Sequence, residues 1–261
     1  MASAFGLPVG GRITSRLSET ISETRPDRRR AVIVAARNEA DRIGSTVSAL
    51  ARALPDALVV LADDGSSDGT ARVALEAGAV LPEGGDAGRR RGGKGGAMTH
   101  ATRFALAELG GDPSAFLLCD GDLGESASEL VALVAAVESG RCDLAIASFA
   151  RSEGGGFGIA LGFARRAIER LVGLELSAPI SGQRALRGEA LERLLPFAPR
   201  FGMEIGLTTD AVRAGLRIEE IELDLRHRPT RRTPAGFAHR ARQLVDFVRV
   251  YLSRRGPRPP H

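Results

Sequence analysis

Two aspartates one residue apart, Asp120 and Asp122, follow the apolar run AFLLC (115–119). In an extended segment, residues i and i+2 point to the same side, so both carboxylates can face one ligand. Two neighbouring carboxylates repel each other unless a cation lies between them. Mg²⁺ and Mn²⁺ prefer hard oxygen ligands of this kind and also bind phosphate oxygens. The spacing therefore predicts a divalent metal site that serves a phosphate-bearing ligand.

A second group of carboxylates, Asp63, Asp64 and Asp68, follows the apolar run ALVVLA (57–62). Acids packed around a tight turn need hydrogen-bond donors or positive charge nearby. Ser66 and Asp68 are residue types that favour turns and the first position of a helix. We expect Asp64 to meet a nucleotide, whereas Asp63 shapes the turn.

The Gly- and Arg-rich run GRRRGGKG (88–95) fits the first seven positions of a phosphate-binding P-loop. Gly95 stands where a Ser or Thr should hold Mg²⁺, and no strand leads directly into the run, which disfavours a nucleoside triphosphatase. A calcium loop starting at Asp64 is also disfavoured, because its twelfth position, which requires Glu, is Leu75. Lys94 and the backbone N–H groups around it can still lie against a diphosphate.

Apolar runs alternate with helical patterns through the first half of the chain. The runs at 31–36, 57–62, 115–119 and 143–148 predict buried strands, and the segments between them predict helices. This alternation favours an α/β fold with a mainly parallel central sheet and helices on both faces. Ligands of such sheets bind at the carboxyl ends of the strands. The polar residues that follow the predicted strands are Asn38, Glu39, Asp63, Asp64, Asp120 and Asp122.

The chain divides into three parts by pattern. Residues 1–29 lack sustained periodicity and predict a flexible arm, 30–225 form the main domain, and 226–261 form a basic loop with a C-terminal amphipathic helix. We expect the last helix to pack an apolar stripe on the core, with some contact to an anionic membrane. The predicted stripe consists of Phe237, Ala241, Leu244, Val245, Val248 and Leu252.

Composition narrows the classes of partner. The net charge is only +4, but arginines cluster at 25–30, 89–91 and 226–232, which suits phosphate-bearing ligands or an anionic membrane face. One Tyr and no Trp disfavour a nucleic-acid partner, since bases stack on aromatic side chains. Two cysteines do not make a disulfide framework. Without a signal peptide or membrane-spanning run, we expect a cytoplasmic protein, with peripheral membrane contact and a homodimer left open.

Taken together, these segments resemble family 2 glycosyltransferases, which have the nucleotide-sugar-binding GT-A fold. The matching segments extend over roughly 31–225, and the resemblance within the family is to polyprenyl- and dolichyl-phosphate sugar transferases, whose SGFRA-type motif matches SGQRA (181–185). The matching segments are VIVAARNEADRI, ADDGSSDGT, GGKGGAM, CDGDLGE and SGQRALRGEAL.

The resemblance implies a role for each matching residue. Ala35, Ala36, Glu39 and Asp64 would hold the base and ribose of a UDP- or GDP-linked sugar. Lys94, Asp120 and Gly121 would contact the donor near its diphosphate. Asp120 and Asp122 would hold Mg²⁺ or Mn²⁺. Close relatives carry a glutamine where this chain has Gly124, so the third protein ligand is open, with Glu125 and His227 as substitutes.

The acceptor is expected to be phosphorylated, because the second half of the chain is rich in arginine. We expect Arg151, Arg165, Arg184 and Arg228 to bind it, and Arg184 of SGQRA to act in catalysis together with Asp122 and Glu204. A phosphate nucleophile is already anionic near neutral pH and needs cations rather than a base. A hydroxyl nucleophile needs a general base, for which Glu204 and Asp210 are the candidates.

Three functions follow from this interpretation. The first is a metal-dependent transfer of a sugar to polyprenyl phosphate with inversion. The second is a soluble transferase that makes glucosyl- or mannosyl-3-phosphoglycerate with retention. The third is a non-catalytic nucleotide-sugar-binding protein that has kept the fold.

Overall fold

The protein is described by a computed structural model that covers residues 29–83, 86–110, 113–149, 158–225 and 234–256. All but the last residue of the expected N-terminal arm and the whole of the basic loop 226–233 lie outside these ranges. Six strands form one sheet: β1 (Arg30–Ala36), β2 (Ala57–Asp63), β3 (Ala115–Asp120), β4 (Leu144–Phe149), β5 (Arg184–Arg187) and β6 (Ile218–Leu223).

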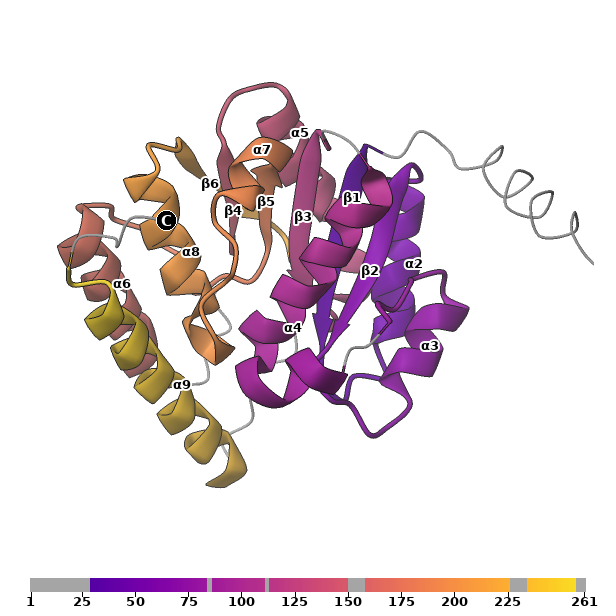
Figure 1. Cartoon of the computed structure of the whole chain (residues 1–261), viewed down its shortest axis with the longest axis horizontal. Coiled ribbons are helices and arrows are strands. Elements are labelled where there is room, and N and C mark those ends of the chain that lie inside the picture. Colours follow the sequence, from indigo (N-terminus) through magenta and orange to yellow (C-terminus); the bar gives the residue numbers. More distant parts are fainter. Residues whose placement is uncertain (1–28, 84–85, 111–112, 150–157, 226–233, 257–261) are drawn as a thin grey trace, which may run out of the picture.

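The sheet has the strand order β2-β1-β3-β5-β4-β6 and is mainly parallel (Figure 1). Strand β1 pairs in parallel with β2 and β3, and β4 pairs in parallel with β6. Strand β5 runs antiparallel to both of its neighbours, β3 and β4. The expected α/β fold with a mainly parallel sheet is confirmed, with β5 as the exception that the pattern did not predict.

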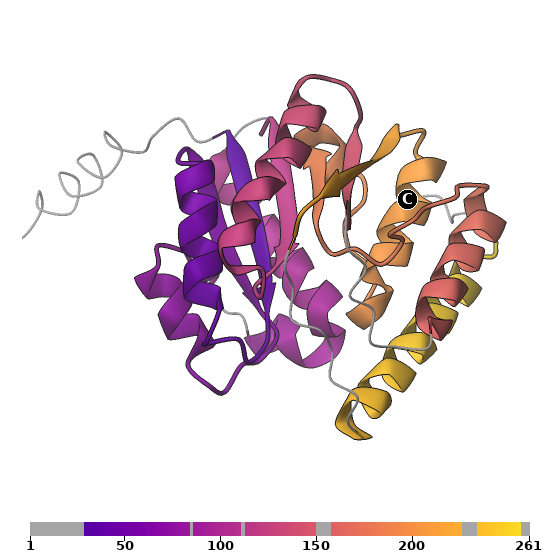
Figure 2. The same cartoon turned by 180° about the vertical axis from the view of Figure 1, so that it is seen from behind.

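Helices cover both faces of the sheet, as the views from the two sides show (Figures 1 and 2). One face carries α2, α3, η1 and α5, and the other carries α4, α6, α8 and α9. The bounds are α2 (Ile43–Ala53), α3 (Thr70–Glu76), α4 (Asp86–Leu109), η1 (Gly124–Leu130), α5 (Val131–Glu138), α6 (Ile159–Val172), α7 (Gly188–Glu192), η2 (Arg200–Gly202), α8 (Met203–Arg213) and α9 (Pro234–Ser253).

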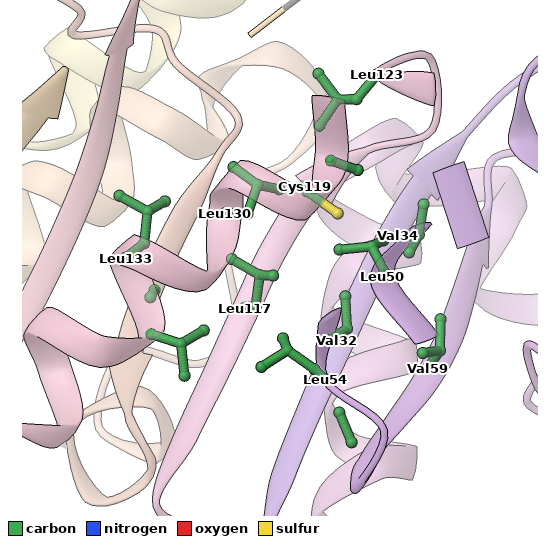
Figure 3. Packing of buried hydrophobic residues seen from close by; sticks show 14 of the residues in the cluster. Val32, Val34, Leu50, Leu54, Val59, Leu117, Cys119, Leu123, Leu130 and Leu133 are labelled. Atoms are coloured by element: carbon green, nitrogen blue, oxygen red, sulfur yellow. The ribbon is translucent and has the colours of Figure 1, made fainter. Parts of the chain in front are cut away.

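The core consists of two layers, one on each side of the sheet. In β1, Val32 and Val34 belong to one layer while Ile33 belongs to the other, and all three are fully buried. Figure 3 shows the first layer, in which Leu50 of α2 lies beside Val34 and Leu117 of β3 lies below Leu130. A strand buried on both faces reads as a continuous apolar run, which is why the first three strands could be recognised from sequence.

The last helix packs on the core through a different face from the one predicted. Phe247 and Val250 are buried, whereas Val245 and Leu252 of the predicted stripe are 48% and 55% exposed. Val250 lies against the backbone of Gly202, where a Cβ would be 2.1 Å from Val250 Cγ2. This glycine contact selects the buried face, and it cannot be read from the periodicity of the helix. In the described ranges, no helix has the length and apolar character needed to cross a membrane.

This orientation of α9 predicts unequal costs for two substitutions. Phe247→Ala should lower the free energy of unfolding by about 3–5 kcal/mol, because a fully buried ring leaves a cavity. Leu252→Ala should change it by less than about 0.5 kcal/mol, because this side chain faces solvent. Urea unfolding of both variants measures the difference. Equal losses would contradict the orientation of α9 described here.

Candidate active site

The carboxyl ends of β1, β2 and β3 meet at one edge of the sheet. The strand register places Ala36 beside Asp63 of β2, and Ala35 beside Asp120 of β3. Backbone hydrogen bonds continue beyond these pairs, since Asp64 N donates to Ala36 O and Gly121 N donates to Ala35 O. The predicted donor residues of all three strands are therefore brought together at the edge where α/β sheets bind ligands.

The turn after β2 is held by its own side chains. Asp63 is buried, and its Oδ1 accepts hydrogen bonds from the backbone N and the hydroxyl of Ser66 at 2.9 and 2.6 Å. Asp64 has no such role in the turn. Burial raises the pKa of the Asp64 carboxyl, and Arg37, 3.4 Å away, acts in the opposite direction. The contacts of Asp63 fit the expectation that it shapes the turn, and the contact of Asp64 with a ligand stays a prediction.

Residues 38–40 are tied to the same turn. Asn38 N donates to the Ser66 hydroxyl, and Asn38 Oδ1 accepts from Ser67 N at 2.9 Å. Glu39 N donates to Thr70 Oγ1 at 2.8 Å. Asn38 itself has a positive φ of 56°, a conformation that Asn tolerates better than most residues. These contacts fix the backbone on which Glu39 stands.

The Asp-Gly-Asp loop is supported from below by Thr46 of α2, which sequence reasoning missed. The buried Thr46 hydroxyl donates to Gly121 O at 2.7 Å and accepts from Gly124 N at 2.8 Å. A Cβ on Gly121 would lie 2.6 Å from Glu39 Oε2 and 2.8 Å from Ile43 Cδ1. Any side chain at this position would therefore displace the Glu39 carboxyl and the end of Ile43, which favours glycine between the two aspartates.

Lys94 joins three elements at this edge. Its Nζ lies 2.7 Å from Asp120 Oδ1 of β3 and 2.8 Å from Glu204 Oε1, in the first turn of α8. Burial alone would lower the pKa of Lys94, but the two carboxylates outweigh burial and raise the pKa, so the ammonium stays charged. The structure thus brings together three of the residues singled out in the sequence. Glu204 is held in an ion pair.

The glycines next to Lys94 allow the chain segment 198–200 to pack against it. A Cβ on Gly95 would lie 1.9 Å from Ala198 O, and a Cβ on Gly93 would lie 3.0 Å from Arg200 Cγ. Gly93 also interrupts the helical geometry of α4 with a φ of 54°. The run that resembles a P-loop therefore serves close packing and presents Lys94 to the two carboxylates.

Glu39 is the most perturbed carboxyl of the site. It is partly buried, and its pKa is raised to about 8 by this burial, then by the negative charges of Asp122 and Asp120. Within the described ranges its Oε2 atom has no hydrogen-bond partner. Perturbed carboxyl groups of this kind are typical of functional sites. An orphaned carboxylate oxygen beside two aspartates shows that this edge is short of positive charge, which suits a bound cation.

The donor set fits a divalent metal that a substrate completes. Asp120 and Asp122 supply hard oxygens, and Mg²⁺ is commonly held by one or two carboxylates together with substrate phosphates. The described residues contain no group of three or more His, Cys, Asp or Glu side chains that could hold a metal without a substrate. Glu125, a proposed third ligand, is 71% exposed and paired with Arg52 instead. His227, the other candidate, lies outside the described residues.

Arg184 requires a correction. We expected it to bind the acceptor and act in catalysis, but it is 1% exposed and each of its three nitrogens already donates a hydrogen bond. Nε donates to Ser181 O, Nη1 to Thr208 Oγ1 and Nη2 to Pro179 O. Burial lowers its pKa to about 10, and the nearby carboxylates of Glu204 and Glu220 act in the opposite direction. Its geometry supports a positioning role for the loop 179–181.

The residue of the SGQRA motif that does reach the site is Gln183. Its Nε2 donates to Asp120 Oδ2 at 3.2 Å, and a Cβ on Gly182 would lie 2.5 Å from the same oxygen. Because β5 runs antiparallel to β3, the segment that enters β5 arrives beside the end of β3. Gln183 was not predicted as a site residue, and its place next to Arg184 in the motif is the signal that could have indicated it.

The other expected acceptor and base residues are placed as follows. Arg165 of α6 is exposed, and its Nη2 donates to Ser177 O at 2.6 Å. Asp210 of α8 forms an ion pair with Arg254 at 2.6 Å, so it stabilises the packing of α9 rather than facing Lys94. Arg151 and Arg228 lie outside the described residues.

The raised pKa of Glu39 predicts how metal-free protein responds to pH. The folded state holds a proton on Glu39 up to pH of about 8, whereas the unfolded chain releases it near 4.5. The contribution of this proton to the free energy of unfolding is therefore complete below pH 4.5 and is lost as the pH rises through 8. Glu39→Gln should remove this decline, so that the variant gains at least about 1 kcal/mol, or about 2–4 °C in Tm, over the parent between pH 5 and pH 8.5.

The measurement is thermal unfolding at a series of pH values in the presence of a chelator. Glu125→Gln is the matched control, because it makes the same chemical change at an exposed carboxyl that pairs with Arg52. A parent and a Glu39→Gln variant with parallel pH profiles would refute the assignment of the buried proton to Glu39.

Comparison with known proteins identifies the family of the chain. The model of the glycosyl transferase family 2 matches residues 31–195, more than half of the chain. This range includes Glu39, Asp64, Lys94, Asp120 and Asp122. Among curated proteins, no significant match was found.

Solved structures with the same fold cover nearly the whole chain. Glucosyl-3-phosphoglycerate synthase from Mycobacterium tuberculosis, in complex with Mn²⁺, UDP-glucose and phosphoglyceric acid, is 25% identical, with 97% of this chain and 87% of that chain covered and a TM-score of 0.70. The same enzyme with Mg²⁺ and UDP is 25% identical, with 96% and 86% covered and a TM-score of 0.68. A further mycobacterial protein is 27% identical, with 96% and 81% covered and a TM-score of 0.69.

Proposed function

The chain belongs to glycosyl transferase family 2, and on that premise we propose that it transfers glucose from UDP-glucose to a small phosphorylated acceptor of the 3-phosphoglycerate type. The observation that carries this proposal is the likeness, over 97% of the chain, to a synthase solved with Mn²⁺, UDP-glucose and phosphoglyceric acid. It replaces polyprenyl phosphate as our first choice of acceptor. An acceptor that is soluble in water also fits the expected cytoplasmic location.

The residues divide between donor and metal. Asp64 and Glu39, at the ends of β2 and β1, bind the nucleoside of the donor. Asp120 and Asp122 hold Mg²⁺ or Mn²⁺, the ions found in the related solved structures. A bound metal ion supplies positive charge to the departing nucleoside diphosphate. Lys94 adds a second positive charge, already fixed in place by Asp120 and Glu204 before the substrate arrives.

An acceptor of the 3-phosphoglycerate type has a hydroxyl that can act as the nucleophile and anionic groups that the protein can bind. A hydroxyl nucleophile calls for a base. Both candidates form ion pairs, Asp210 with Arg254 and Glu204 with Lys94, and the pair of Glu204 is the one at the donor edge. Glu204 shares Lys94 with the metal-binding Asp120, so we assign to Glu204 the proton of the acceptor hydroxyl. The cations that hold the phosphate of the acceptor are expected among the arginines of the second half, with Arg151 and Arg228 as the first to test.

A transfer assay with two donors and two acceptors tests this function. Radiolabelled UDP-glucose and GDP-mannose are each supplied with Mg²⁺ or Mn²⁺ and with 3-phosphoglycerate or a polyprenyl phosphate, and the products are partitioned between water and organic solvent. We expect a new labelled anion in water from UDP-glucose and 3-phosphoglycerate, abolished by a chelator. The coupling constant at the anomeric carbon of that product then gives the stereochemical course.

Polyprenyl phosphate is kept as the second candidate because of two observations. The SGQRA segment matches a motif of the polyprenyl-phosphate transferases, and α9 exposes Val245 and Leu252 beside Arg242 and Arg249. Metal-dependent label in the organic phase would favour this acceptor over 3-phosphoglycerate. No transfer with any combination would favour a nucleotide-sugar-binding protein without catalytic activity.

A further inference from the structure

The segment between α7 and α8 contains an arginine in an unusual backbone conformation. Arg200, the first residue of η2, has a positive φ of 57°. Among the described residues, Asn38 is the single other non-glycine residue with a positive φ, and it is tied to the nucleotide-binding turn. A positive φ is unfavourable for arginine, because its side chain does not make the local hydrogen bonds that stabilise Asn in this conformation. Residues that do adopt it are concentrated at functional sites.

Packing places Arg200 directly beside Lys94. The position of a Cβ on Gly93 is 3.0 Å from Arg200 Cγ and 3.3 Å from Arg200 Cα, so the stem of the arginine passes over the backbone just before Lys94. Ala198 O meets Gly95 in the same way on the other side of Lys94. The left-handed conformation therefore turns Arg200 toward the donor edge of the sheet rather than away from it.

The charge of Arg200 also reaches this edge. The Arg200 guanidinium is one of the positive charges that counteract the raised pKa of Asp64 at the end of β2. Arg200 is exposed, and within the described part of the chain it forms no ion pair of its own. A cation that lies near both Lys94 and Asp64, and that forms no ion pair with a described residue, suits an anionic ligand at this edge.

We propose that Arg200 contacts the α-phosphate of the nucleotide donor, the group that links the nucleoside at Asp64 to the part of the diphosphate at Lys94 and the metal. This proposal rests on the proposed function for the presence of a nucleotide. It adds a donor-binding residue from the second half of the chain, outside the five segments that carry the family resemblance. A guanidinium can bind phosphate with two parallel N–H groups, which makes arginine the suitable cation.

Three variants separate the charge of Arg200 from its backbone. Arg200→Gly removes the charge and relieves the strained φ, Arg200→Ala removes the charge and keeps the strain, and Arg200→Lys keeps a charge without the bidentate geometry. Binding of UDP and of UMP, each with Mn²⁺ and without acceptor, is measured by titration calorimetry, and Tm is measured for each variant. UMP shares the α-phosphate with UDP but lacks the β-phosphate.

We expect Arg200→Gly and Arg200→Ala to weaken the binding of both nucleotides by about tenfold, and Arg200→Lys to weaken it less. We expect the Tm of Arg200→Gly to exceed that of Arg200→Ala, because glycine adopts a positive φ without strain. Weaker nucleotide binding together with an undiminished Tm in Arg200→Gly would show that the variant is folded and has lost a contact with the nucleotide.

Three results would overturn the proposal. Arg200→Gly could bind UDP as tightly as the parent, which would mean that the arginine has no contact with the donor. The loss could affect UDP but not UMP, which would move the contact to the β-phosphate. A parent that binds neither UDP nor UMP would refute the donor site and the role of Arg200 together. The first two results leave the proposed function intact, so the two failures are distinguishable.

Discussion

Replacing Asp122 with asparagine should lower kcat for the proposed sugar transfer by about 10²–10³-fold while the protein remains folded. The amide has the same shape as the carboxylate but lacks its charge, so we expect it not to hold the proposed divalent cation near the leaving group. Asp120→Asn should cause a similar loss. In that variant Lys94 also loses one of its two carboxylate partners, 2.7 Å away, so we expect a lower Tm as well.

The measurement is kcat and KM for donor and acceptor across a range of Mn²⁺ concentrations. Asp143→Asn is the matched control, because Asp143 lies before β4 at the opposite edge of the sheet. Hydrogen bonds from Arg217 hold the pKa of Asp143 down to about 2, so its loss should affect stability and not turnover. Turnover that survives in both Asp120→Asn and Asp122→Asn would refute the catalytic assignment.

Asp122→Asn also has a readout that does not depend on activity. After burial, the charge of Asp122 is the largest cause of the raised pKa of Glu39. Removing that charge should bring the pKa of Glu39 closer to its ordinary 4.5, so the loss of stability at high pH becomes smaller than in the parent. An unchanged pH profile would show that the two carboxyl groups are not close in solution.

The donor half of the site could be predicted because its signals are local. Strands buried on both faces read as apolar runs, and the carboxylates that follow β2 and β3 belong to the edge where those strands end. The role of Asp63 in the turn could be predicted for the same reason, since Ser66, three residues later, is a turn signal.

The acceptor half could not be predicted in the same way. Arginine is almost never fully buried unless it is paired, so the complete burial of Arg184 goes against its residue type. Its burial is possible because the carbonyl groups of Pro179 and Ser181 receive its N–H groups, and that loop conformation leaves no periodic pattern. Strand β5 is only four residues long and includes this arginine, which explains why it was missed.

Contacts between distant segments were also out of reach. Lys94 and Glu204 are separated by 110 positions. The residues around each of them in the sequence give no sign that the two form an ion pair. The tight approach of Gly95 to Ala198 depends on the same long-range packing. The charged residues of the site are visible in the sequence. Which of these charges form ion pairs depends on the fold.

Replacing Lys94 with methionine should damage both stability and turnover. Asp120 and Glu204 would lose their shared cation, and removing one partner from a buried ion pair costs about 3–5 kcal/mol. Because the Lys94 and Asp120 side chains are 20% and 32% exposed, solvent screens part of this cost, and we expect about 1–3 kcal/mol. For a chain of this size the corresponding fall in Tm is about 2–10 °C. The loss of a fixed positive charge at the leaving group should lower kcat by about 10²-fold.

A double variant tests whether the loss of stability in Lys94→Met comes from the broken ion pair or from the lost packing of the lysine stem. Lys94→Met combined with Glu204→Gln removes the uncompensated charge of α8, so its Tm should lie above that of Lys94→Met alone, while turnover stays low. Mn²⁺ should likewise raise the Tm of Lys94→Met more than that of the parent, because a bound cation compensates Asp120. If the double variant and added Mn²⁺ both fail to raise the Tm, the stability of this edge depends on the packing of the Lys94 stem. The role of its charge would then be limited to the substrate.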